Sequence, residues 1–63
     1  MKAKNMILVD NNKSIAFNVQ RRKNKAIIDY FTDSELDYQI ECELDRANKF
    51  YETAMKEGYS EAF

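Results

Sequence analysis

Histidine, proline and tryptophan are absent from this 63-residue chain, which has one glycine and one cysteine. Without histidine, imidazole base catalysis and histidine metal sites are excluded. The lone Cys42 can form neither an internal disulfide nor a thiolate metal site, and such sparing use of cysteine is typical of the reducing cytoplasm. The single glycine, Gly58, excludes a glycine-rich phosphate-binding loop. We therefore predict a cytoplasmic protein that is not an enzyme and has no cofactor and no metal site.

Long apolar runs are missing as well. The longest, residues 6–9, is far too short to span a bilayer, and no charged segment followed by an apolar one opens the sequence as a leader. A chain of this length forms one small domain with one core, and its stability is marginal because it buries only about 60% of its unfolded surface. We expect a soluble single domain, residues 1–63, that does not contact a membrane.

The formal net charge of −1 conceals an uneven distribution of charged residues. Residues 1–31 carry a charge of +5, whereas residues 32–63 carry −6. Within one small domain the two halves attract each other, but such asymmetry also points to charged partners. The chain is rich in asparagine, lysine, isoleucine and tyrosine, a composition associated with AT-rich genomes such as those of phages.

The most regular pattern in the sequence predicts a long amphipathic helix over residues 33–57. Thr32 and Glu35 match a capping box at its start, and no proline or glycine interrupts the residues that follow. At its end, Gly58 suits the left-handed position of a helix terminus, and the next residue can fold back onto Ala54. The start and stop signals thus agree on one helix.

Helical spacing sorts this segment into two faces. The apolar face consists of Leu36, Ile40, Leu44, Ala47, Tyr51 and Ala54. The opposite face carries an acidic ridge formed by Glu41, Asp45 and Glu52 and flanked by Asp37, with Tyr38 beside it. Such a ridge is either an ordinary solvated surface or a surface that steers a basic partner, and an exposed tyrosine favours a contact.

Three strands are predicted before the helix. Residues 6–10 are an apolar run that ends in an asparagine turn, and residues 14–20 alternate between apolar and polar side chains. Residues 25–31 also fit the start of a helix, but their β-branched and aromatic side chains favour a strand. The prediction is an α+β fold: a three-stranded antiparallel meander (β-β-β-α) packed against one long C-terminal amphipathic helix, with a tail at 58–63.

The sheet is expected to have a second apolar face. In the third strand the residues facing the helix would be Ala26, Ile28 and Tyr30. Ile27 and Phe31 then face away with Asp29 between them, because the opposite choice would bury the carboxylate. The first strand is apolar on both sides, so it too contributes large side chains to the uncovered face. A contiguous apolar patch of this kind usually marks an interface.

The first functional hypothesis is a small protein-binding module, such as a phage- or mobile-element-encoded modulator or inhibitor of a host nucleic-acid-handling protein. Its partner is a host protein or a second copy of the chain, forming a homodimer. The apolar sheet face and the acidic ridge would make the contact. The residues expected to anchor it are Ile27, Phe31 and Tyr38, and those expected to steer it are Glu41, Asp45 and Glu52.

The alternative hypothesis is a small DNA-binding domain. Its phosphate contacts would come from the basic turn Arg21, Arg22, Lys23 and Lys25, and its base contacts from Asn18 and Gln20. In the order of its elements over about residues 6–57, the expected fold resembles the arm-binding domains of tyrosine recombinases and plant ethylene-response-factor domains. That resemblance implies a sheet that enters the major groove. The sequence departs from both families in its overall charge and in Asp29 on the reading face.

Overall fold

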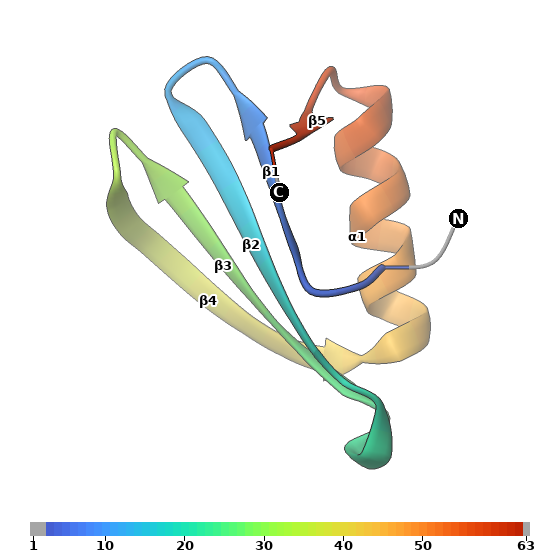
Figure 1. The fold of residues 1–63 in the computed structure, drawn as a ribbon. Coiled ribbons are helices and arrows are strands. Elements are labelled where there is room, and N and C mark those ends of the chain that lie inside the picture. Colours follow the sequence, from blue (N-terminus) through green and yellow to red (C-terminus); the bar gives the residue numbers. More distant parts are fainter. Residues whose placement is uncertain (1–2, 63) are drawn as a thin grey trace.

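The computed structural model describes residues 3–62, which form an antiparallel five-stranded sheet and one helix (Figure 1). The elements are β1 (Met6–Asp10), β2 (Lys13–Gln20), the 3-10 turn η1 (Arg21–Lys23), β3 (Lys25–Thr32), β4 (Glu35–Glu43), α1 (Leu44–Lys56) and β5 (Ser60–Glu61). Their order in the sheet is β4-β3-β2-β1-β5. The predicted α+β class, with an antiparallel sheet and one helix, is confirmed.

Asparagine residues shape the two turns that join the first three strands. Asn11, between β1 and β2, has φ of 55°, and Asn24, which closes η1, has φ of 54°. The backbone N–H of Asn24 donates to the backbone carbonyl of Arg21 at 3.1 Å. Asparagine tolerates the left-handed conformation better than most residues, so it takes the place that glycine often has in such turns.

The predicted helix start at residue 33 is wrong, because residues 35–43 form β4. Asp33 and Ser34 both have positive φ, 52° and 67°, which makes them the two central residues of a tight hairpin between β3 and β4. Thr32, read from the sequence as a helix cap, pairs with Glu35 across this turn. Its hydroxyl donates to the Asp37 carboxylate at 2.5 Å. The sheet therefore has a fourth main strand, and the predicted three-stranded meander is incomplete.

Pairing with β3 explains why this segment is extended. Its inward side chains Tyr38, Ile40 and Cys42 lie opposite Tyr30, Ile28 and Ala26 of β3. Such cross-strand side-chain pairs stabilise a sheet. The backbone of β4 also satisfies the groups that β3 would otherwise leave unpaired at an edge. Between Tyr30 and Phe31 the register shifts by a β-bulge.

The two ends of α1 differ in how they are capped. At the start, Glu43 makes no side-chain cap hydrogen bond, and the amide of Leu44 donates instead to the Asn24 carbonyl at 3.3 Å. At the end, Gly58 has φ of 107°, and the amide of Tyr59 donates to the Ala54 carbonyl at 3.1 Å. The predicted glycine terminus with its fold-back onto Ala54 is confirmed.

A single core lies between α1 and one face of the sheet. Its buried residues are Ala3, Met6, Leu8, Ile15, Phe17, Ala26, Ile28, Ala47, Tyr51 and Ala54. Tyr51 is 2% exposed and meets the Phe17 ring edge-on, with centroids 6.3 Å apart. The prediction that Ala26 and Ile28 face the helix is confirmed by their burial. Leu36 and Ile40, expected on the apolar helix stripe, lie on β4 instead.

The C-terminal tail extends the sheet on the side of β1. Within it, β5 pairs antiparallel with β1, Leu8 opposite Glu61 and Val9 opposite Ser60. The amide of Ala62 donates to the Ile7 carbonyl at 2.8 Å. Phe63, which the sequence places at the end of this tail, lies outside the described residues. The structure thus covers one edge of the sheet only with a two-residue strand.

Candidate protein-binding surfaces

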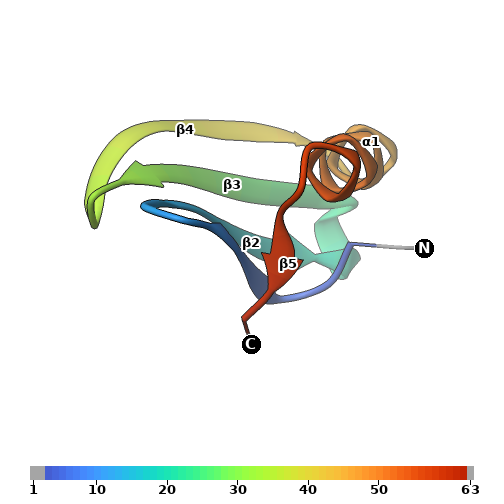
Figure 2. The same cartoon turned by 90° about the horizontal axis from the view of Figure 1, so that it is seen from above.

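The face of the sheet turned away from α1, here called the outer face, carries an apolar patch. α1 lies on the other side of the sheet, and no described element covers this one (Figures 1 and 2). The strand register places on it the apolar side chains Ile7, Val9, Ala16, Ile27, Phe31 and Leu36. None of the six is buried or packs against the core, and Leu36 is 57% exposed. They form a surface separate from the core.

Three of the four charged residues that the strand register places on the outer face are acidic. Asp29 lies in the row between Ala16 and Gln39, and its carboxylate accepts a hydrogen bond from the Gln39 amide at 2.7 Å. This bond holds Asp29 beside the apolar patch without burying its charge. Toward the end of β4 that leads into α1, Glu41 is opposite Ile27 and Glu43 is opposite Lys25.

The predicted protein-binding residues are divided among three surfaces. Ile27, Phe31 and Glu41 share the outer face, as the register requires. Tyr38 lies on the opposite face of the sheet, because it pairs with Tyr30. The remaining two, Asp45 and Glu52, are exposed on α1. The continuous acidic ridge expected on one helix is therefore wrong: its first half belongs to a strand, whose side chains alternate between two faces.

Tyr30 and Tyr38 form a stacked pair on the helix side of the β3–β4 hairpin. Their ring centroids are 4.6 Å apart and the rings are inclined by 14°. Partial burial, with a smaller contribution from Tyr38, raises the pKa of Tyr30 to about 12. Tyr38 itself remains 53% exposed. From the sequence, the exposed Tyr38 is a sign of a contact. Stacking on Tyr30 partly explains why an aromatic residue occupies this exposed position.

A groove of about 900 Å³ separates the C-terminal half of β4 from α1. Its apolar wall is formed by Ile40 and Cys42 of β4 and by Phe50 of α1. Arg46 lies over the Phe50 ring, with its guanidinium carbon 5.8 Å from the centroid. Burial raises the pKa of the Cys42 thiol, although Arg46 opposes the shift. The thiol is consequently protonated at neutral pH and contributes to the groove as a small apolar group.

Sequence reasoning missed this groove because it assigned residues 33–43 to the helix. A strand and a helix that meet at Glu43 create two walls, whereas one continuous helix creates none. The signal that could have indicated it is the alternation of Tyr38, Ile40 and Cys42 with polar residues.

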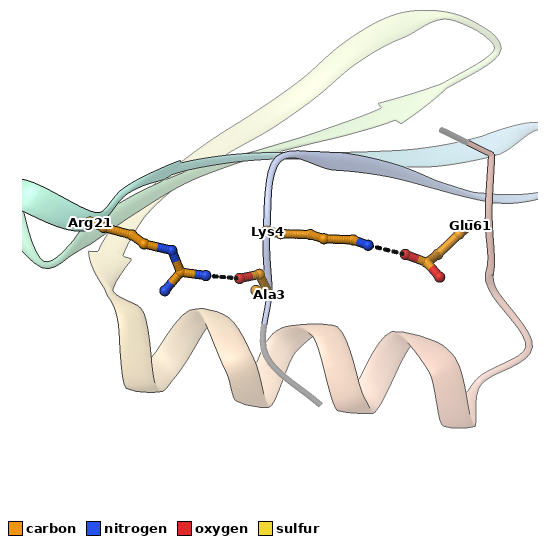
Figure 3. Close-up of polar contacts among 4 residues, drawn as sticks. All are labelled: Ala3, Lys4, Arg21 and Glu61. Atoms are coloured by element: carbon orange, nitrogen blue, oxygen red, sulfur yellow. Dashed lines mark hydrogen bonds and ion pairs between the residues drawn. The ribbon is translucent and has the colours of Figure 1, made fainter.

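The residues of the DNA-binding hypothesis lie near one end of the sheet. Asn18 and Gln20 share the outer face with Lys25, and Arg22 and Lys23 are exposed in η1. Arg21 instead donates to the Ala3 carbonyl at 3.3 Å, which ties the N-terminal segment to this turn (Figure 3). Nearby, Lys4 pairs with Glu61 at 3.9 Å (Figure 3). Lys25 lines the groove together with Glu41 and Glu43, so acids border the basic turn.

Residues 3–62 contain no group of three or more histidine, cysteine, aspartate or glutamate side chains placed to hold a metal ion. No helix in this part of the chain has the length and apolar character needed to cross a membrane.

Comparison with protein-family models, with curated proteins and with solved structures finds no match to the chain. The resemblance to arm-binding and ethylene-response-factor domains depended on three strands followed by a helix. With β4 inserted, the order is four strands followed by a helix, so the element order no longer supports that resemblance.

Proposed function

We propose that the protein is a non-enzymatic protein-binding module and that the outer face of its sheet is the binding surface. The observation that carries the proposal is the apolar patch itself: six apolar side chains from four strands lie outside the core. A soluble domain this small gains nothing in core stability from side chains such as Phe31 and Leu36 on that face. Exposed groups of apolar side chains bordered by polar residues, such as Ser14 and Asp29 here, often mark interaction sites.

The charges around the patch favour a basic partner. Among the strand residues of the outer face, three acids, Asp29, Glu41 and Glu43, outnumber one base, Lys25, while Arg22 and Lys23 lie in η1 at one end. A complementary surface is apolar and bordered by arginine or lysine, because opposite potentials accelerate association and disfavour wrong partners. Nucleic-acid-handling proteins carry such surfaces, so the proposal extends to a modulator or inhibitor that competes with nucleic acid for one of them. A second copy of the chain would oppose acid to acid.

The test compares protein captured by three immobilised forms of the chain. Leu36→Asp places a charge at the most exposed apolar side chain of the patch, whereas Met55→Asp makes the same change on α1, where Met55 is 39% exposed. We expect a partner to be retained by the wild type and by Met55→Asp and to be lost by Leu36→Asp, which keeps its circular dichroism spectrum. Equal retention by all three forms would contradict the proposal, and so would a stable homodimer seen by light scattering.

DNA binding is the second candidate, supported by the exposed Arg22 and Lys23 beside Asn18 at one end of the outer face. It requires affinity for a DNA duplex that falls steeply with salt, because each phosphate contact releases counterions. Arg22→Ala combined with Lys23→Ala should then abolish binding. Under the protein-binding proposal, the solution mass is unchanged when a short duplex is added.

A further inference from the structure

Among residues 3–62, no strand pairs with the outer edge of β4 over its nine residues. β4 pairs with β3 on one side only, whereas the opposite edge is occupied by the two-residue β5. An edge strand directs alternate backbone N–H and C=O groups away from the sheet, where they can pair with another chain. From Tyr38 to Glu43, beyond the bulge, the pairing of β4 with β3 is regular. These six residues offer an edge about 20 Å long for pairing.

The groove between β4 and α1 runs beside this same part of the edge. Ile40 and Cys42 face it from the strand, and Phe50 and Thr53 face it from the helix. A chain added to β4 would direct every second side chain into the groove and the others onto the outer face. Backbone pairing supplies affinity in this mode of recognition, and the pocket for alternate side chains supplies specificity.

The charges of β4 indicate which chain fits. The strand contains Glu35, Asp37, Glu41 and Glu43 and no basic residue. A second copy paired antiparallel about Gln39 would place Glu41 opposite Asp37, and like charges in cross-strand positions are destabilising. Self-association through this edge is thus opposed, whereas lysine or arginine over Glu41 and Glu43 is favoured.

We propose that the β4 edge binds an extended peptide that alternates basic and apolar residues and joins the sheet as an additional strand. Its basic side chains lie over Glu41 and Glu43 on the outer face. Its apolar side chains enter the groove against Ile40, Cys42 and Phe50. This surface shares Glu41 and Glu43 with the acidic border of the outer face, but it does not use the apolar patch and does not depend on the proposed function.

Basic residues on the helix wall fix the register of the added strand. On the side of α1, Arg46 and Lys49 line the groove together with one acid, Asp45, so the helix wall has a net positive charge. A strand shifted by one residue would turn its basic side chains toward this wall and its apolar side chains toward Glu41 and Glu43. Because a one-residue shift exchanges the two faces of a strand, this arrangement of charges selects one register.

The first test uses a synthetic peptide of alternating lysine and valine, labelled for fluorescence anisotropy. We expect saturable binding that weakens with salt, together with slower hydrogen exchange of the amides of residues 38–43. A peptide with the same side chains but a fully N-methylated backbone keeps the charge and cannot pair, so it should not bind. Equal binding of the two peptides, or no binding of either, would overturn the proposal.

The second test uses matched charge variants of the protein. Glu41→Lys reverses an acid that would face the basic side chains of the added strand, and Glu52→Lys reverses an exposed charge on α1 away from that strand. Loss of a favourable cross-strand pair predicts a ~5-fold weaker affinity for Glu41→Lys and little change for Glu52→Lys. Equal weakening by both would show only general attraction and contradict strand addition. Leu36 lies before the bulge, outside residues 38–43. The Leu36→Asp variant should therefore still bind the peptide, although it loses the outer-face partner.

Discussion

Side-chain packing at Tyr30 and Tyr38 changes the acidity of a phenol. Their rings stack on the helix side of the β3–β4 hairpin, and Tyr30 is partly buried. A phenolate at this position would be poorly solvated, so the folded protein keeps the proton of Tyr30 to a higher pH than an unfolded chain does. The stability of the folded hairpin therefore depends on whether Tyr30 is protonated.

A pH titration tests this linkage. In the folded state the pKa of Tyr30 is about 12, against about 10 in an unfolded chain. The raised pKa contributes stability that is fully present below pH ~10 and is lost as the pH rises toward ~12, since the unfolded state releases its proton first. We expect denaturation midpoints to fall over this range. Tyr38→Ala should lower the pKa of Tyr30, as followed by ultraviolet absorbance of the phenolate; an unchanged pKa would contradict the role of the stack.

Among the elements, β4 decides the architecture, and its hairpin turn is the point at which strand and helix can be told apart. Ser34 has φ of 67°, a conformation that costs a residue with a side chain about 1–2 kcal/mol but suits glycine. If this segment were the first turn of a helix instead, glycine there would bring no gain.

Ser34→Gly therefore tests the β3–β4 hairpin. We expect it to stabilise the protein by about 1 kcal/mol, which raises the thermal midpoint by about 5 °C in a domain of this size. The matched change Ser14→Gly, inside β2, should lower the midpoint because glycine weakens a strand. A lower midpoint for both variants, measured by circular dichroism, would contradict the turn.

Most elements were predictable from local patterns, and β4 was not. Strands β1 to β3 and the glycine end of α1 follow from alternation, turn residues and capping, which act within a few residues. Residues 36–44 fit a helical stripe through Leu36, Ile40 and Leu44 as well as a strand. The choice depends on pairing with β3, a contact between segments, and local propensity does not determine it. Because of this error, the acidic residues predicted to form one ridge lie on both β4 and α1. The outer-face residues predicted from β3 lie where they were expected.

At the scale of the whole molecule, one helix covers one face of a sheet that is apolar on both. The core uses the face toward α1, and the outer face retains Ile27, Phe31 and Leu36 at its surface. Acidic side chains on β4 border both the outer face and the open edge. We propose that two adjacent surfaces bind partners: the apolar patch a folded protein, and the β4 edge an extended peptide.

Hydroxyl-radical footprinting of the chain, free and in complex with its captured partner, tests whether the outer face is the binding surface. It reports the solvent exposure of individual side chains by mass spectrometry. The outer-face proposal predicts that Phe31 and Leu36 become protected in the complex, while Tyr38 and Met55 keep their reactivity. Protection of Tyr38 or Met55 with Leu36 still fully reactive would place the partner on another surface and contradict the proposed function.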